Sequence, residues 1–320
     1  MKSVFVILVF AFALTAVAGE KIIRIGMIGL DTSHCRAFTR IINDSTYEDH
    51  IPGAKVVVAY KGGSPDVEAS YTRIDKFTNE LREKYNVEIV PDIPTLLQKV
   101  DAVIITSVDG RVHLEQARPV IAAGKPLFVD KPMAASLKDV KEIFRLANEA
   151  NVPCFSASSL RFFKELQDVL KDKSLGRVLG CDAYSPASYE PHHPDLFWYG
   201  VHGVEILFTA MGPQCTTATR THTRSTDVVA GVWQDGRIGT FRGTREGAHG
   251  YGATIFFEKG IRHVTPGKGS FYKYLVKEII RFFRTGVSPV DQNETIAMFA
   301  FMEAAQKSKE KGGVPVKLSK

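Results

Sequence analysis

The chain has few cysteines, no cluster of basic residues and no long apolar stretch beyond its first residues. Its 320 residues include 4 cysteines, 41 lysines and arginines, and 35 aspartates and glutamates, and the basic excess is dispersed. Without a basic patch interleaved with aromatic residues, nucleic-acid binding is not expected. No stretch after the first residues approaches the roughly 20 apolar residues that span a bilayer, so no membrane anchor is expected.

The four cysteines, Cys35, Cys154, Cys181 and Cys215, lie far apart in the sequence. Cys154 and Cys181 lie in apolar, strand-like runs, where buried free thiols are common. An exported chain would permit disulfides, but we expect four free thiols.

The first 18 residues have the pattern of an export signal. Lys2 supplies a basic start, residues 4–14 are uncharged and apolar, and Ala16-Val17-Ala18 is a small-residue cleavage site. We therefore expect cleavage after Ala18 and a mature protein in the periplasm or outside the cell. About 300 residues remain, which is enough for two domains of ordinary size.

Strand and helix patterns alternate in residues 19–157. Apolar runs that resemble buried strands are separated by helical patterns that begin and end at capping or turn residues. Strands that are apolar throughout predict a parallel sheet covered on both faces, so we expect a Rossmann-type doubly wound domain over residues 19–157. The expected strands are 21–29, 54–60, 87–90, 101–106, 126–129 and 152–156, and the expected helices are 33–43, 67–85, 93–99, 112–123 and 136–150.

Residues 158–320 have a different character. β-rich segments dominate there, and Asp235-Gly236 is a hairpin turn signal between two of them. We predict an α/β domain with a large, mostly antiparallel open sheet and helices on one face. The expected strands are 178–184, 216–223, 227–234, 238–242 and 252–257, and the expected helices are 163–170, 199–211, 271–283 and 293–309.

The turn after the first strand is a damaged dinucleotide fingerprint. In Gly-x-Gly-x-x-Gly, the second glycine lets a pyrophosphate approach the backbone and the third lets helix and strand pack closely. Here only Gly29 is kept, and Asp31 and His34 take the second and third positions. A carboxylate at this point opposes a phosphate and competes for the helix N-terminus. The alternatives are helix capping by Asp31, Thr32 or Ser33, a modified pyrophosphate loop, or direct contact with a substrate.

The second strand ends without the acidic residue that commonly holds the adenine ribose. The segment there is Tyr60-Lys61-Gly62-Gly63-Ser64. Lys61 and Ser64 would suit the 2′-phosphate of NADP, and a solvated loop lysine is the alternative.

The strand at 126–129 ends in Asp130-Lys131-Pro132. This places a carboxylate and an ammonium group at the edge of the sheet where ligands of open parallel sheets bind. Lys131 beside Asp130 would hold a sugar hydroxyl and tune a proton transfer. Pro132 would fix the turn through a trans or a cis bond. A purely structural turn is the alternative.

These motifs resemble the glucose-fructose oxidoreductase and inositol dehydrogenase (Gfo/Idh/MocA) family over nearly the whole mature chain. The resemblance rests on residues 25–30, 104–106, 159–162 and 304–308 and most specifically on Asp130-Lys131-Pro132, where members usually have Glu-Lys-Pro. It implies a dimer or tetramer formed through the second sheet. It also implies NAD or NADP, with cofactor-binding residues Gly29, Asp31, Thr32, Ser33, His34, Lys61, Thr106, Ser107, His113, Asp130 and Lys131.

The resemblance further implies an Asp-x-x-x-His pair on a helix of the second domain that supplies acid–base chemistry. His202 takes the histidine position, but Trp198 replaces the aspartate. Glu205 lies three residues on, on the same helical face, and is expected to replace the lost partner. Lys131, His202 and Glu205 are therefore the predicted catalytic residues, with an ordinary packed His202 as the alternative.

The segment 189–199 mixes histidines, an aspartate and aromatic residues just before that helix. Such a mixture suits a carbohydrate ring, and a loop of solvated histidines is the alternative. Because the spacing matches no standard metal motif, no metal site is predicted. The predicted substrate-binding residues are Lys131, His192, His193, Asp195, Trp198, Tyr199 and His202.

We therefore expect an oxidoreductase that acts on a sugar, a polyol or a related carbohydrate with bound NAD or NADP. The alternatives are a cofactor-independent carbohydrate-active enzyme, either a lyase or a hydrolase, and a sugar-binding protein on the same fold. Asp31, the missing acid after the second strand and Trp198 count against the nicotinamide enzyme. So does export, because free nicotinamide cofactor is scarce outside the cytoplasm.

Overall fold

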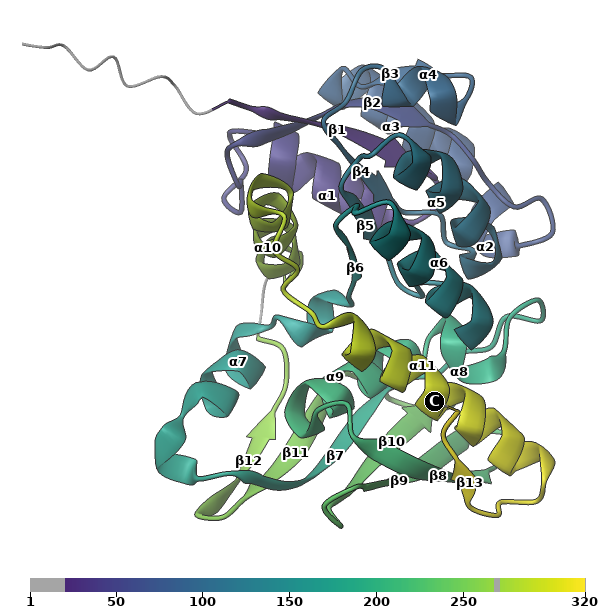
Figure 1. Ribbon diagram of the computed structural model, residues 1–320, viewed down its shortest axis with the longest axis vertical. Helices are drawn as coiled ribbons and strands as arrows, with labels where there is room; N and C mark the ends of the chain where they lie inside the picture. Colours follow the sequence, from purple (N-terminus) through teal and green to yellow (C-terminus); the bar gives the residue numbers. More distant parts are fainter. Residues whose placement is uncertain (1–20, 268–270, 320) are drawn as a thin grey trace, which may run out of the picture.

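The computed structural model describes residues 21–267 and 271–319. The predicted export signal at residues 1–18 lies outside these ranges. Two sheets lie at opposite ends of the molecule, with helices between and around them (Figure 1). Within the described part of the chain, no helix combines the length and the apolar character needed to cross a membrane.

The first sheet is six-stranded and parallel throughout, as predicted. Its order is β3-β2-β1-β4-β5-β6. Strands β2 and β3 are added on one side of β1, and β4 to β6 on the other, so the order changes direction between β1 and β4. A crevice forms at such a switch point, outside the carboxyl ends of the strands, and ligands bind there. The strands are β1 (Ile23–Ile28), β2 (Ala54–Tyr60), β3 (Glu88–Val90), β4 (Ala102–Ile105), β5 (Leu127–Val129) and β6 (Cys154–Ser156).

Helices cover both faces of this sheet. Thr32 caps the first, and Ser136 caps the last by accepting a hydrogen bond from the amide of Asp139 at 3.0 Å. The prediction of a single helix over 67–85 is wrong, because the helix is interrupted between Tyr71 and Ile74. Next to this interruption, the Ser70 hydroxyl forms hydrogen bonds with neighbouring loops. The helices are α1 (Ser33–Asn43), α2 (Glu68–Tyr71), α3 (Ile74–Tyr85), α4 (Ile93–Leu97), α5 (His113–Ala122) and α6 (Leu137–Glu149).

The second sheet has seven strands in the order β12-β11-β7-β10-β9-β8-β13, and only the β7–β10 pair is parallel. The predicted, mostly antiparallel open sheet is therefore confirmed. Strands β12 and β13 were not expected: β12 follows the short turn Glu258-Lys259, and β13 has two residues. The strands are β7 (Val178–Pro186), β8 (Cys215–His222), β9 (Thr226–Trp233), β10 (Ile238–Thr244), β11 (Gly252–Phe257), β12 (Gly260–Val264) and β13 (Val316–Lys317).

One face of the second sheet carries helices α9 (Val201–Met211) and α11 (Gln292–Glu310). Two short 3₁₀ segments, η2 (Ser159–Arg161) and η3 (Lys173–Leu175), and helix α7 (Lys164–Lys171) connect β6 of the first sheet to β7 of the second, and helix α8 (Asp195–Trp198) precedes α9. A further 3₁₀ segment, η1 (Gly110–Val112), precedes α5.

Helix α10 (Tyr272–Thr285) belongs to the second half of the sequence but packs against α1 of the first (Figure 1). Its Leu275, Val276 and Ile279 are fully buried in one apolar cluster with Phe38 and Ile41 of α1. The core of the Rossmann unit is therefore completed by a segment from near the end of the chain.

The four cysteines are free thiols, as expected. Burial raises the pKa of Cys154 and of Cys215 to about 12. At neutral pH these thiols stay protonated, so they act as small apolar groups rather than as nucleophiles.

Candidate active site

A cavity of about 240 Å³ lies at the carboxyl ends of the first sheet, where the two halves of the molecule meet. This volume suits a ligand of about monosaccharide size. The cavity brings together Lys131, Trp198, Tyr199 and His202, which the sequence predicted from two separate motifs. Its described lining consists of Thr32, Ser33, His34, Ala69, Arg73, Val108, Lys131, Ser159, Leu160, Ser188, Trp198, Tyr199, His202, Tyr251, Phe271 and Tyr272.

Asp130 and Lys131 follow β5, and the bond between Lys131 and Pro132 is cis. Asp130 is buried, and its Oδ2 lies 2.6 Å from Nδ1 of His34. Burial opposes ionisation of Asp130, but His34 and Lys131 outweigh it and hold the pKa of the carboxyl below its ordinary value. Asp130 is therefore a carboxylate that orients a histidine, while Lys131 lines the cavity.

His202 lies on α9, with its Nδ1 2.7 Å from the hydroxyl of Ser158. Burial, with the nearby Lys131 and His34, holds the pKa of His202 well below its ordinary value. The ring is therefore neutral at neutral pH. Tyr199 and Tyr251 pack edge-on against it, so its orientation is fixed.

Glu205 does not partner His202, contrary to the prediction. Its Oε1 accepts a 2.6 Å hydrogen bond from Nε of Arg161, which also pairs with Glu294 of α11. Arg161 and Glu205 are buried and Glu294 is partly buried, and Glu205 is not among the described residues that line the cavity. A buried carboxylate requires a charged partner, and here Arg161 supplies it. The arrangement gives Glu205 a structural position rather than the predicted catalytic one.

Three predicted substrate-binding residues, His192, His193 and Asp195, are not among the described residues that line the cavity. His193 Nε2 lies 2.8 Å from Asp109, and His192 Nδ1 lies 2.7 Å from Glu190. Asp195 accepts hydrogen bonds from Arg220 at 3.0 Å and from Lys309 at 2.5 Å. Charged partners hold these three side chains, and their contact with a substrate stays a prediction.

The crevice at the switch point is crossed by Asp31. Its buried carboxylate accepts a 2.9 Å hydrogen bond from the amide of Val108 and a 2.7 Å bond from the hydroxyl of Ser70. Burial raises the pKa of Asp31 above its ordinary value. Beside it, Gly29 has a φ of 86°, and a Cβ there would lie 2.1 Å from Oγ of Ser107. The turn after β1 and the loop after β4 are thus in direct contact.

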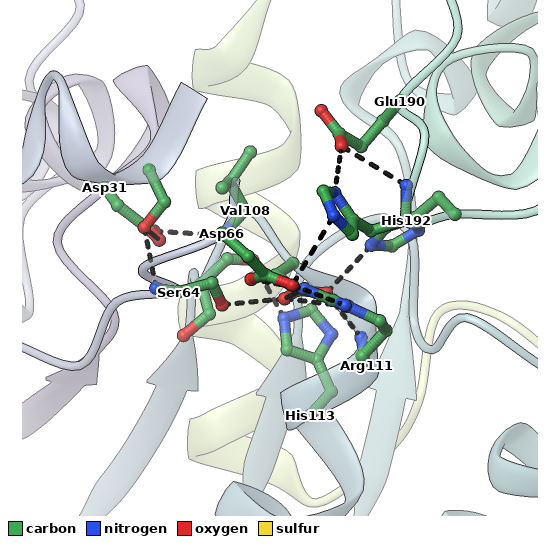
Figure 2. Close-up of polar contacts among 12 residues, drawn as sticks. Asp31, Ser64, Asp66, Val108, Arg111, His113, Glu190 and His192 are labelled. Carbon is green, nitrogen blue, oxygen red and sulfur yellow. Dashed lines mark hydrogen bonds and ion pairs between the residues drawn. The ribbon is translucent and has the colours of Figure 1, made fainter. Parts of the chain in front are cut away.

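A polar network continues from this crossing to the second domain (Figure 2). Asp109 accepts bonds from Ser64 at 2.7 Å and from His193, and Arg111 joins Asp109 to Asp66. The network therefore fastens the loops after β2 and β4 to the segment that precedes α8.

The predicted cofactor-binding residues fall into three groups. Thr32, Ser33, His34 and Lys131 line the cavity. Lys61 instead pairs with Asp75 at 2.6 Å, outside the described lining. The others make buried contacts that shape the crevice: Gly29 and Asp31 as described, Asp130 with His34, Thr106 with the Gly29 carbonyl, Ser107 with Gln116, and His113 with the carbonyls of Ser107 and Met133.

Several cavity residues were not anticipated, among them Arg73, Tyr251 and Tyr272. Arg73 lies at the break between α2 and α3, and a basic residue soon after the second strand was the available signal. Tyr251 and Tyr272 come 49 and 70 positions after His202, and no local pattern marks them.

A nicotinamide dinucleotide, which the fold implies, fits this site at its reactive end. The first turn of α1 presents backbone amides and a positive dipole end to a phosphate, and Arg73 adds a positive charge on the same cavity. Lys131 and His202 line the remaining space. At the switch point, however, the Asp31–Val108 contact has to open before a whole dinucleotide can lie in the crevice.

A doubly wound sheet with a cavity at its switch point is the architecture of dinucleotide-binding domains. Residues 23–159 match the model of an oxidoreductase family with an NAD-binding Rossmann fold, Gfo/Idh/MocA. The first domain therefore resembles the Gfo/Idh/MocA family, as its sequence motifs predicted.

Individual relatives agree with this assignment. Inositol 2-dehydrogenase 2 of Saccharopolyspora erythraea is 29% identical over 148 residues, which span 44% of this chain and 43% of that enzyme. The match thus covers less than half the length of this curated relative.

Solved structures resemble the whole fold. Myo-inositol 2-dehydrogenase from Lactobacillus plantarum superposes with a TM-score of 0.77 at 17% identity, covering 93% of this chain and 100% of the other. Scyllo-inositol dehydrogenase from Lactobacillus casei, with bound NAD(H) and scyllo-inositol, gives 0.75 at 16% identity, covering 93% and 99%. At these identities the likeness establishes the fold.

Proposed function

We propose that this protein oxidises or reduces a polyol or a cyclic sugar, using NAD or NADP, in the cavity between its two halves. The observation that carries the proposal is that Lys131 and His202, from different domains, line one cavity of monosaccharide size beside the N-terminus of α1. The likeness to inositol dehydrogenases supports a polyol as the substrate class. When bound, the cofactor supplies the hydride acceptor or donor.

The side chains divide the remaining work. The ammonium group of Lys131 binds the reacting oxygen and stabilises negative charge that develops there. Neutral His202 forms a hydrogen bond to a neighbouring hydroxyl and so orients the ring. Trp198 and Tyr199 offer apolar faces to its C–H groups. The first turn of α1, with Arg73, holds a phosphate of the cofactor.

The test is a rate assay on the purified protein with NAD or NADP and a panel that includes myo-inositol and scyllo-inositol. Reduction of cofactor is expected with at least one polyol, and Lys131→Met should lower kcat/KM by about 100-fold or more. Lys138→Met, on the exposed side of α6, is the matched control and should change little. Tight binding of NAD and NADP without turnover of any sugar or polyol would contradict the proposal.

We also propose that copies of the chain associate through the open face of the second sheet. Val232 of β9 and Ile238 of β10 are paired neighbours on that face and are 40% and 58% exposed. Ile261 of β12 is 53% exposed as well. Exposed apolar side chains on an uncovered sheet suit an interface with a second, identical sheet.

We further propose that the chain is exported. The support is the basic start at Lys2, the apolar residues 4–14 and the small residues before position 19. N-terminal sequencing of the native protein should give a first residue of Gly19 in the exported fraction. A protein that keeps Met1 and stays in the cytoplasmic fraction would contradict this.

A further inference from the structure

A histidine–carboxylate pair faces the cavity from the first domain. His34 lies in the first turn of α1, and its Nδ1 is 2.6 Å from Oδ2 of Asp130. The two side chains are 5% and 1% exposed. No hydrogen bond to Nε2 of His34 occurs within the described residues, and the ring lines the cavity. That nitrogen is therefore available to a ligand.

The ring is held in place from two sides. Phe38 stacks on it with centroids 5.2 Å apart, and Tyr272 of α10 meets it edge-on at 4.9 Å. Burial raises the pKa of Tyr272 to about 12, so its phenol stays neutral. Because the ring cannot turn freely, Nε2 has a fixed direction when a substrate enters.

His202 lacks these features. Trp198 stands where a carboxylate partner would be, Glu205 is bound to Arg161, and Nδ1 of His202 meets the hydroxyl of Ser158. A histidine bound to a carboxylate is the stronger base, because the carboxylate stabilises the imidazolium that forms. Of the two cavity histidines, only His34 has such a partner.

We propose that His34, oriented by Asp130, is the acid–base residue of the oxidoreduction, an inference that rests on the proposed function. In the oxidation direction, the O–H bond of the alcohol breaks and its proton moves to Nε2 of His34. A C=O bond forms as the C–H bond breaks, and the hydrogen leaves with both electrons of that bond as a hydride, which would reduce the nicotinamide cofactor. In reduction, His34 returns the proton. Asp130 is a positioning residue that acts through His34.

The charged and titratable groups around His34 fit this role. Asp130 and Lys131 face it from the loop after β5, His202 from α9 and Tyr272 from α10. His34, which replaces the third glycine of the dinucleotide fingerprint, therefore has a role in the proposed reaction.

The first experiment compares variants in the polyol assay. His34→Asn should lower kcat by 10²- to 10⁴-fold, with the Kd for cofactor within about threefold of wild type. It should also abolish the acidic limb of the kcat pH profile, and Asp130→Asn should shift that limb. His263→Asn, on the exposed edge of the second sheet, is the control. A His34→Asn variant that keeps kcat within threefold overturns the proposal, while turnover itself upholds the oxidoreductase.

The second experiment needs no turnover and decides the matter if the wild-type protein reduces no cofactor. Nitrogen-15 NMR of histidine-labelled protein at pH 8 should show the His34 ring with its proton on Nδ1, toward Asp130. Asp130→Asn should lower the share of that tautomer. A His34 ring protonated on Nε2 in the wild-type protein overturns the inference.

Discussion

The carboxylate of Asp31 and the backbone amide of Val108 meet at 2.9 Å across the point where the first sheet changes direction. This hydrogen bond joins the turn after β1 to the loop after β4. The hydroxyl of Ser70 donates a second hydrogen bond to the same carboxylate. A side chain of this protein thus occupies the position where a fingerprint glycine would admit a pyrophosphate.

Asp31→Asn should strengthen cofactor binding. Asparagine keeps an oxygen that accepts from Val108 but removes the negative charge beside the N-terminus of α1, where such a charge repels a phosphate. We expect Kd values for NAD and NADP to fall by about 3- to 10-fold, as about 1 kcal/mol implies. Calorimetric titration checks this, with Asp235→Asn in an exposed hairpin as the control. Weaker or unchanged binding would show that Asp31 does not oppose the cofactor.

Glu205→Gln should destabilise the fold rather than remove a catalytic group. Arg161 would keep Glu294 but lose its partner on α9, which leaves a buried charge poorly compensated. We expect the free energy of unfolding to fall by about 2–4 kcal/mol. Urea denaturation measures this. If stability is unchanged while kcat falls 100-fold, the structural assignment of Glu205 is wrong.

Asp109→Asn should cost stability in a pH-dependent way. Burial opposes ionisation of Asp109, but hydrogen bonds from His193, Arg111 and Ser64 outweigh it and lower the pKa of this carboxyl far below the ordinary value. A depressed pKa stabilises the fold above the unfolded-state value of about 3.9, and this is lost as pH falls below it. The deficit of the variant should be about 2–4 kcal/mol at pH 7 and shrink below pH 4. A deficit that grows in acid would reverse this conclusion.

Val232→Lys combined with Ile238→Lys should separate the copies of the chain. Both side chains lie on the open face of the second sheet, and burying two ammonium groups in an apolar interface is unfavourable. Light scattering after gel filtration should give an oligomer for the wild type and a monomer for the double variant. Ile22→Lys, at a 58% exposed site before β1, is the control. A wild-type monomer would rule out the interface.

Most helices and strands could be predicted from the local periodicity of apolar residues. The expected bounds of α1 and β2 are those observed, because capping residues and continuous apolar runs mark them within a short window. The position of Lys131 at the sheet edge followed from the rule that ligands bind where parallel strands end. The open second sheet followed from its turn signals.

Side-chain partners were the part that local patterns could not supply. Glu205 lies three residues from His202 in sequence, yet it pairs with Arg161, which is 44 positions away. His193 meets Asp109 across 84 positions, and His34 meets Asp130 across 96. Such pairs depend on which elements pack together and on the need of each buried charge for a counter-charge. The spacing of residues along a helix indicates neither the packing of elements nor the partner of a buried charge.

The packing of α10 against α1 bears on how the molecule is made. Synthesis runs from the N-terminus, so Phe38 and the rest of the α1 face emerge long before Leu275 and Ile279, which cover them. The apolar surface of α1 on the first sheet consequently stays uncovered until nearly all of the chain has been synthesised. A fragment that ends after β6 should aggregate or bind chaperones, and the two halves of the full chain should unfold together rather than one after the other.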